Sequence, residues 1–138
     1  MTMHATGPFD VKLNALEQYN KNEGANLGRM SIDKELHGDL EATSKGEMLT
    51  AMGTVQGSAG YVAIERVTGK LRGRDGSFVL QHSSTMTRGK PAQSISVVPD
   101  SGTGDLAGLE GSMTIVIADQ DGQRKHFYKF EYSLPDAG

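Results

Sequence analysis

The chain has 138 residues, a length that suits one core, so we expect a single domain over residues 1–138. It carries 14 Lys and Arg against 17 Asp and Glu, and this net charge of -3 argues against nucleic-acid binding and a polybasic membrane anchor, because both need a positive field. The absence of Cys from the sequence excludes disulfides, thiolate metal sites and cysteine nucleophiles.

Alternation of apolar and polar residues, interrupted by glycine, predicts strands along most of the chain. The first strand is expected at residues 9–14, followed by a polar surface loop over residues 17–26. Residues 30–40 fit either a helix, with apolar residues four apart, or a strand that enters a turn at residues 37–39. We favour the strand, because Gly38 costs a helix about 1 kcal/mol relative to Ala.

The same signals predict six further strands and no secure helix. These strands are expected at residues 40–51, 57–70, 77–87, 94–98, 113–117 and 126–134. An open sheet of eight short antiparallel strands would expose two edges to other chains, and closure removes both. We therefore predict an all-β fold, a single eight-stranded antiparallel up-and-down β-barrel. A barrel of this size is either filled by its own side chains or holds one small ligand.

Several segments carry a resemblance that covers nearly the whole chain, from residue 9 to residue 134. They are residues 29–32, 38–40, 57–65, 78–82, 97–104 and 126–128. These segments resemble a bacterial domain family of unknown function with an allene-oxide-cyclase-like, calycin-type β-barrel. The glycine turn at residues 102–111 also resembles, more loosely, plant allene oxide cyclases and dirigent proteins.

The resemblance implies a barrel but no activity, because the near family has none assigned and fold does not fix function. By analogy with the wider superfamily, it implies a small hydrophobic molecule inside the barrel and a homo-oligomer, often a trimer. Catalytic residues of the cyclases and dirigent proteins cannot be transferred, since only the glycine turn can be aligned with them.

The predicted strand at residues 57–70 places Tyr61 and Glu65 on one face. If this face points inward, burial would raise the pKa of Glu65 and make it a candidate general acid or base. The opposite face, with Val62 and Ile64, is at least as apolar. A surface position for Glu65 is therefore the simpler interpretation.

Histidines and a tyrosine give further candidates. His82 shares a predicted face with Phe78 and Leu80, where an imidazole can orient a ligand or move a proton, although a structural histidine is the simpler interpretation. His126 and Tyr128 begin another amphipathic face, for which core packing with polar tips at the barrel mouth is the simpler interpretation.

No metal or cofactor site is expected from the motifs. His37, His82 and His126 lie far apart in the sequence and no HExxH motif occurs, although three histidines could still converge inside a barrel. The longest apolar run, residues 113–118, is too short to cross a bilayer, and the first residues do not resemble a signal peptide. We expect a cytoplasmic protein.

The leading functional hypothesis is a binding module that holds one small, largely apolar molecule in the barrel. Its candidate ligand-binding residues are Tyr61, Glu65, His82, His126 and Tyr128. The alternative is a cofactor-independent isomerase or cyclase, in which Glu65 or His82 moves a proton while the wall fixes the substrate conformation. A third hypothesis is a barrel filled by its own side chains that acts through its surface or as an oligomer.

Overall fold

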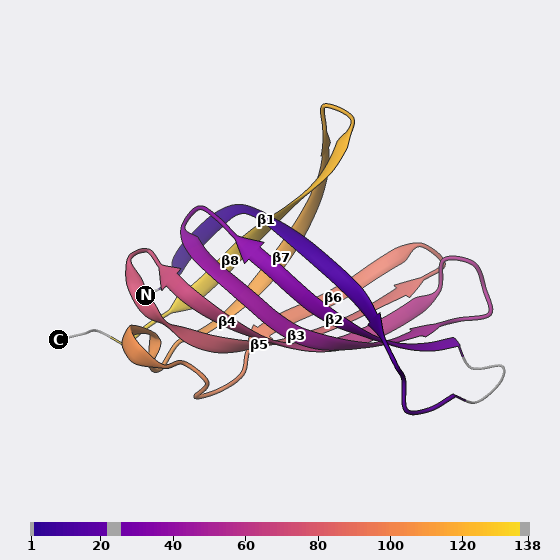
Figure 1. Cartoon of the computed structure of the whole chain (residues 1–138). Coiled ribbons are helices and arrows are strands. Elements are labelled where there is room, and N and C mark those ends of the chain that lie inside the picture. Colours follow the sequence, from indigo (N-terminus) through magenta and orange to yellow (C-terminus); the bar gives the residue numbers. More distant parts are fainter. Residues whose placement is uncertain (1, 22–25, 136–138) are drawn as a thin grey trace.

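The fold is described from a computed structural model, which places residues 2–21 and 26–135. Within these ranges, eight antiparallel strands form a closed barrel in which every strand pairs with its neighbours in the sequence and β8 pairs with β1 (Figure 1). The strands are β1 (Met3–Leu16), β2 (Asn26–Leu36), β3 (Leu40–Met52), β4 (Ala59–Leu71), β5 (Arg74–Thr87), β6 (Lys90–Val97), β7 (Glu110–Gln120) and β8 (Gln123–Ser133). The predicted all-β, eight-stranded up-and-down barrel is confirmed.

The connections follow the glycine signals of the sequence. Residues 30–36 belong to a strand, as favoured, and the turn that follows contains Gly38 with a φ of 94°, a conformation that glycine adopts without steric cost. Residues 17–21 lie outside the strands, and residues 22–25 of the expected loop lie outside the described residues. The connection from β6 to β7 adds a short 3-10 helix, η1 (Gly104–Leu106), which the sequence did not predict. Among the described residues, no helix has the length and apolar character needed to cross a membrane.

Strand register decides which residues face the interior. β4 pairs with β3 from Leu40↔Leu71 to Met52↔Ala59, so its odd-numbered residues all point to the same side. Glu65 is 1% exposed, whereas Ile64 beside it is 51% exposed. The interpretation of Glu65 as a surface residue is therefore wrong. The opposite face of β4 holds Val62 and Ile64 but also the exposed Arg66 and Lys70, whereas the face of Glu65 continues with the buried Val67 and Leu71.

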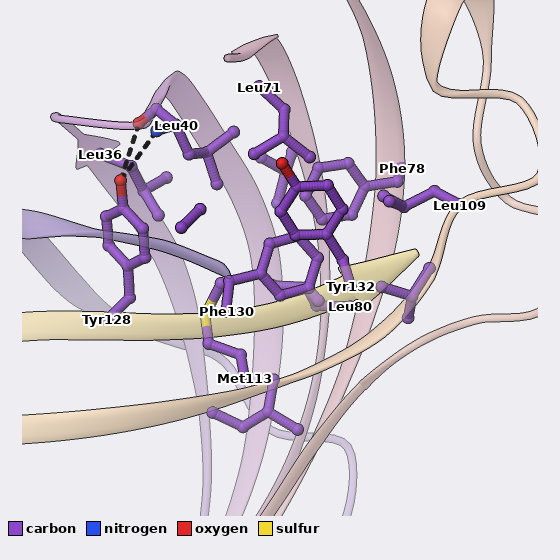
Figure 2. Packing of buried hydrophobic residues seen from close by; sticks show 14 of the residues in the cluster. Leu36, Leu40, Leu71, Phe78, Leu80, Leu109, Met113, Tyr128, Phe130 and Tyr132 are labelled. Carbon is purple, nitrogen blue, oxygen red and sulfur yellow. Dashed lines mark hydrogen bonds between the residues drawn. The ribbon is translucent and has the colours of Figure 1, made fainter. Parts of the chain in front are cut away.

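One end of the barrel, which we call the packed end, is filled by side chains. It carries the turns at residues 37–39 and 72–73 and the connection at residues 98–109. Phe130 stacks against both Phe78 and Tyr132, with ring centroids 5.7 and 5.1 Å apart (Figure 2). Further buried residues there are Leu36, Leu40, Val67, Leu71, Leu106 and Leu109. This end has the close packing of a protein core.

At the opposite, open end the hairpin of β7 and β8 diverges from its neighbours (Figure 1). β6 and β7 are paired at Ile95↔Met113 and Ser96↔Ser112, and the β1 and β8 pairing runs from Met3↔Tyr132 to Phe9↔His126. The β7 and β8 ladder continues beyond both, to Gln120↔Gln123. The outer half of this hairpin therefore extends away from β1 and β6. We call the line along which β6 and β7 separate the seam.

Candidate functional site

A cavity of about 240 Å³ lies where the packed core ends and the hairpin diverges. Most of its walls are apolar, from inward-facing residues in the outer halves of the strands. These are Phe9, Val11, Leu13, Ile32, Met48, Ile115 and Ile117. Six polar residues complete the lining, namely Lys34, Tyr61, Glu65, His82, Gln93 and His126. The rim of the cavity is open, since Leu13 is 44% and Ile117 is 55% exposed.

Four of the five residues that we singled out in the sequence meet at this cavity. Tyr61, Glu65, His82 and His126 come from β4, β5 and β8, and all four line it. They are brought together because each occupies an inward position on its strand. His37, in contrast, is exposed in the turn between β2 and β3, so the three histidines do not converge.

Tyr128 lies apart from the other four and does not line the cavity. Its position agrees with the simpler interpretation of core packing. Its side chain is fully buried at the packed end, where its hydroxyl donates to the carbonyl oxygen of His37 at 2.6 Å. The hydroxyl also accepts from the backbone N–H of Leu40 at 2.9 Å (Figure 2). Burial raises the pKa of Tyr128 to about 12. These contacts fasten the turn at residues 37–39 to β8, so the geometry gives Tyr128 a structural role.

An ion pair occupies the floor of the cavity. Lys34 on β2 donates to Oε2 of Glu65 on β4 at 2.8 Å, and the hydroxyl of Ser44 on β3 donates to Oε1 at 2.8 Å. The ammonium of Lys34 also lies 5.3 Å from the centre of the Phe9 ring, a cation–π distance. Both carboxylate oxygens of Glu65 therefore have partners, as a buried charge requires.

His82 connects this ion pair to Tyr61 on the cavity wall. Its Nε2 is 2.8 Å from the Tyr61 hydroxyl, and its Nδ1 is 3.9 Å from Oε2 of Glu65, beyond hydrogen-bond distance. The two rings meet edge to face, with centroids 4.9 Å apart. We call Lys34, Ser44, Glu65, His82 and Tyr61 the polar cluster.

The charge state of Glu65 limits what the polar cluster can do chemically. Burial alone raises the pKa of this carboxyl, but His82, Lys34 and Ser44 outweigh burial and lower the pKa to about 2. A carboxylate that is ionised and fully hydrogen-bonded near neutral pH is a poor general acid and a weak base. The expected rise in the pKa of Glu65 is therefore wrong in direction, because burial also brought the carboxyl a cationic partner.

The comparisons with known proteins agree with this fold. Residues 5–132 match a family described as a protein of unknown function, DUF3224. The chain belongs to the DUF3224 family. A crystal structure of a DUF3224 protein of unknown function from Shewanella oneidensis MR-1 is 52% identical, and the match covers 99% of this chain and 100% of that one with a TM-score of 0.91. No curated protein matches the chain.

Family membership confirms the resemblance to a family of unknown function. The geometry of this DUF3224 barrel also places residues at the cavity that sequence reasoning missed. Lys34 shares an alternating face with Met30, Ile32 and Leu36, and this apolar set was a signal that Lys34 points inward. Ser44 carried no comparable signal. Its role depends on the pairing of β3 with β2 and β4, which sequence alternation does not specify.

Gln93 is a further missed residue, at the seam of the DUF3224 barrel. Its Oε1 accepts from the backbone N–H of Ile115 at 3.4 Å, although β6 and β7 have already separated at this level. The side chain of Gln93 thus bridges the opening between the two strands. Also in the cavity lining, the ring of His126 lies against Phe9, with centroids 5.3 Å apart.

A metal could be held at a different place, on the outer surface. One ligand atom each from Asp10, Glu35 and His37 lies within 4.8 Å of the others, near the turn between β2 and β3. All three side chains are exposed. Exposed acidic groups often approach one another in this way without a metal, and none of the three residues lines the cavity.

Proposed function

We propose that this DUF3224 barrel binds a small, largely apolar molecule in the cavity at its open end. The observation that carries the proposal is the difference between the two ends of the barrel. The packed end is filled by stacked aromatic rings and leucines, whereas the open end keeps a cavity of about 240 Å³ with mainly apolar walls. Concave, apolar sites with a few polar groups are typical of small-molecule binding.

The size of the cavity sets the size of the molecule. A cavity of roughly 150 Å³ is enough for benzene, so this one fits a molecule of roughly ten non-hydrogen atoms. The exposed side chains of Leu13 and Ile117 at the rim would lose water contact when the molecule binds. Each Å² of apolar surface buried in this way contributes about 25 cal/mol to affinity before the entropy cost of binding.

The first test is native mass spectrometry of freshly purified protein, compared with the denatured mass. A released molecule that is largely apolar would support the proposal and identify the chemistry. The second test is an NMR titration with ethylbenzene, read from the methyl signals of Ile115 and Ile117. Ethylbenzene at saturating concentration is expected to shift these signals.

A matched pair of variants locates the binding site. Val11→Trp places a large ring in the cavity, because Val11 lines it, and should abolish the response to ethylbenzene. Lys12→Trp places the same ring on the outer face of the same strand and should leave the response intact. Equal responses in the two variants would show that ethylbenzene binds elsewhere and would contradict the proposal.

A second candidate function, action through the surface as an oligomer, is favoured by one observation. Leu49 and Val62 are direct neighbours on β3 and β4, and together with Ile64 they form an apolar patch that is more than half exposed on the outer face. This outer patch borders a hollow that also contains Arg29 and Glu47. Contiguous exposed apolar surface is typical of protein–protein contacts, and the neighbouring cation and anion suit a second copy of the same chain.

A further inference from the structure

We propose that the molecule bound in this cavity carries an uncharged carbonyl oxygen at the end that enters the barrel. This inference rests on the proposed function and names the chemical class of the ligand. It follows from the hydrogen-bonding groups of the cavity floor, from their charge balance and from the apolar walls above them.

The acceptors of the cavity floor already have donors. Oε1 of Glu65 accepts from Ser44, and Oε2 accepts from Lys34. The side-chain oxygen of Gln93 accepts from the backbone N–H of Ile115. Nε2 of His82 and the Tyr61 hydroxyl are hydrogen-bonded to each other, and Nδ1 of His82 lies 3.9 Å from Oε2 of Glu65. A ligand that only donates hydrogen bonds would therefore have to compete with a partner that is already in place.

Two side chains of the cavity lining, in contrast, keep N–H groups that can donate a hydrogen bond to a ligand. The Lys34 ammonium has three N–H groups, and among the described residues its hydrogen bond is to Glu65. The Gln93 amide has two N–H groups, and among the described residues the hydrogen bond of this side chain is made by its oxygen. Both side chains line the cavity, Lys34 at the floor and Gln93 at the seam. An oxygen acceptor on a ligand in this cavity therefore has two lining side chains that can donate to it.

The charge balance favours a neutral acceptor over a carboxylate. The positive charge of Lys34 is already compensated by the ionised carboxylate of Glu65, 2.8 Å away and 1% exposed. A carboxylate on the ligand would bring a second negative charge close to Glu65 in a region shielded from water, where like charges repel strongly. A carbonyl oxygen accepts the same hydrogen bonds without adding a net charge.

The test compares three probes that share one aromatic ring. Acetophenone has the carbonyl, ethylbenzene replaces it by a methylene group, and benzoate replaces it by a carboxylate. Dissociation constants are measured by NMR titration, read from the methyl signals of Ile115 and Ile117. We expect acetophenone to bind about tenfold more tightly than either of the other two, the effect of one good buried hydrogen bond to a charged or amide donor.

Variants then test whether the preference for acetophenone comes from the proposed donor Gln93. Gln93→Leu removes the amide donors of Gln93 and its acceptor for the N–H of Ile115, at an exposed strand position, and should weaken acetophenone about fivefold relative to ethylbenzene measured on the same variant. Gln81→Leu is the matched control, because Gln81 is exposed on the outer side of the neighbouring strand β5. This control should bind both probes like the unmodified protein.

The outcomes separate this inference from the proposed function. Ethylbenzene or benzoate binding as tightly as acetophenone would overturn the carbonyl assignment and leave the proposed apolar-ligand function standing. A Gln93→Leu variant that keeps the full preference for acetophenone would also overturn the assignment. If none of the three probes at millimolar concentration shifts the signals of Ile115 and Ile117, and native mass spectrometry releases no molecule, the proposed function itself fails.

Discussion

Lys34 and Glu65 form an ion pair inside the barrel, with Nζ 2.8 Å from Oε2 and side chains that are 10% and 1% exposed. The removal of two charges from water is costly, and their attraction offsets this cost only while both partners are present. The pair therefore makes the floor of the cavity polar without giving it a net charge. This arrangement leads to the first two predictions.

Glu65→Gln should lower the free energy of unfolding by about 3–5 kcal/mol, because it leaves the ammonium of Lys34 inside the barrel without its carboxylate. The double variant Lys34→Met with Glu65→Gln should recover most of this loss, since it removes the unpaired charge and keeps an oxygen for Ser44. Urea denaturation measures both values. Glu47→Gln is the control, because the ion pair of Glu47 with Arg29 is exposed and should be worth less than about 1 kcal/mol. A double variant no more stable than Glu65→Gln would contradict the argument.

The stability of the protein should depend on the ionisation of Glu65 at acid pH. The pKa of this carboxyl is about 2 in the folded chain and 4.5 when it is unperturbed. Because the folded pKa is the lower one, its contribution of roughly 3 kcal/mol is fully present above about pH 4.5 and is lost as the pH falls toward 2. Urea denaturation between pH 2 and pH 6 measures this loss. The difference in free energy of unfolding between the unmodified protein and Glu65→Gln should shrink as the pH falls from 6 to 2. A constant difference would show that the folded pKa of Glu65 is not depressed.

Tyr128→Phe should destabilise the packed end without affecting the cavity. The change removes the hydrogen bonds to His37 and Leu40 and should cost about 1–3 kcal/mol, mainly because the buried N–H of Leu40 loses its partner. Thermal or urea denaturation measures the decrease in the free energy of unfolding. Ethylbenzene binding should be unchanged, since Tyr128 does not line the cavity. A loss of binding in a folded Tyr128→Phe variant would place this residue back among the ligand-binding groups.

The outer patch of Leu49, Val62 and Ile64 predicts self-association. Val62→Lys puts a charge at the centre of the patch and should shift the protein toward the monomer in sedimentation equilibrium. Thr68→Lys, at an exposed position further along β4, is the control and should leave the association unchanged. A protein that is monomeric at every concentration measured would rule out the second candidate function.

Much of the architecture could be predicted because alternation and glycine positions are local properties of the chain. The apolar alternation of Phe9, Val11 and Leu13 indicated β1, and Gly38 marked the turn after β2. Strand ends were less predictable. β6 begins at Lys90 and includes Pro91, a residue that usually argues against a strand. Pro91 is tolerated because β6 is paired with β5 at this point, whereas its pairing with β7 is at Ile95 and Ser96.

The sequence by itself determined that this chain forms eight strands and that Tyr61 and Glu65 share one face, because neighbours two apart always point the same way in a strand. Only the tertiary structure decided that this face is the inner one, since a shift of one residue in register would exchange the two faces. It also decided the charge state of Glu65, because closure of the barrel brought Lys34, 31 residues away in the chain, within 2.8 Å of it. The open end likewise depends on where β6 and β7 separate, and no local pattern encodes that separation.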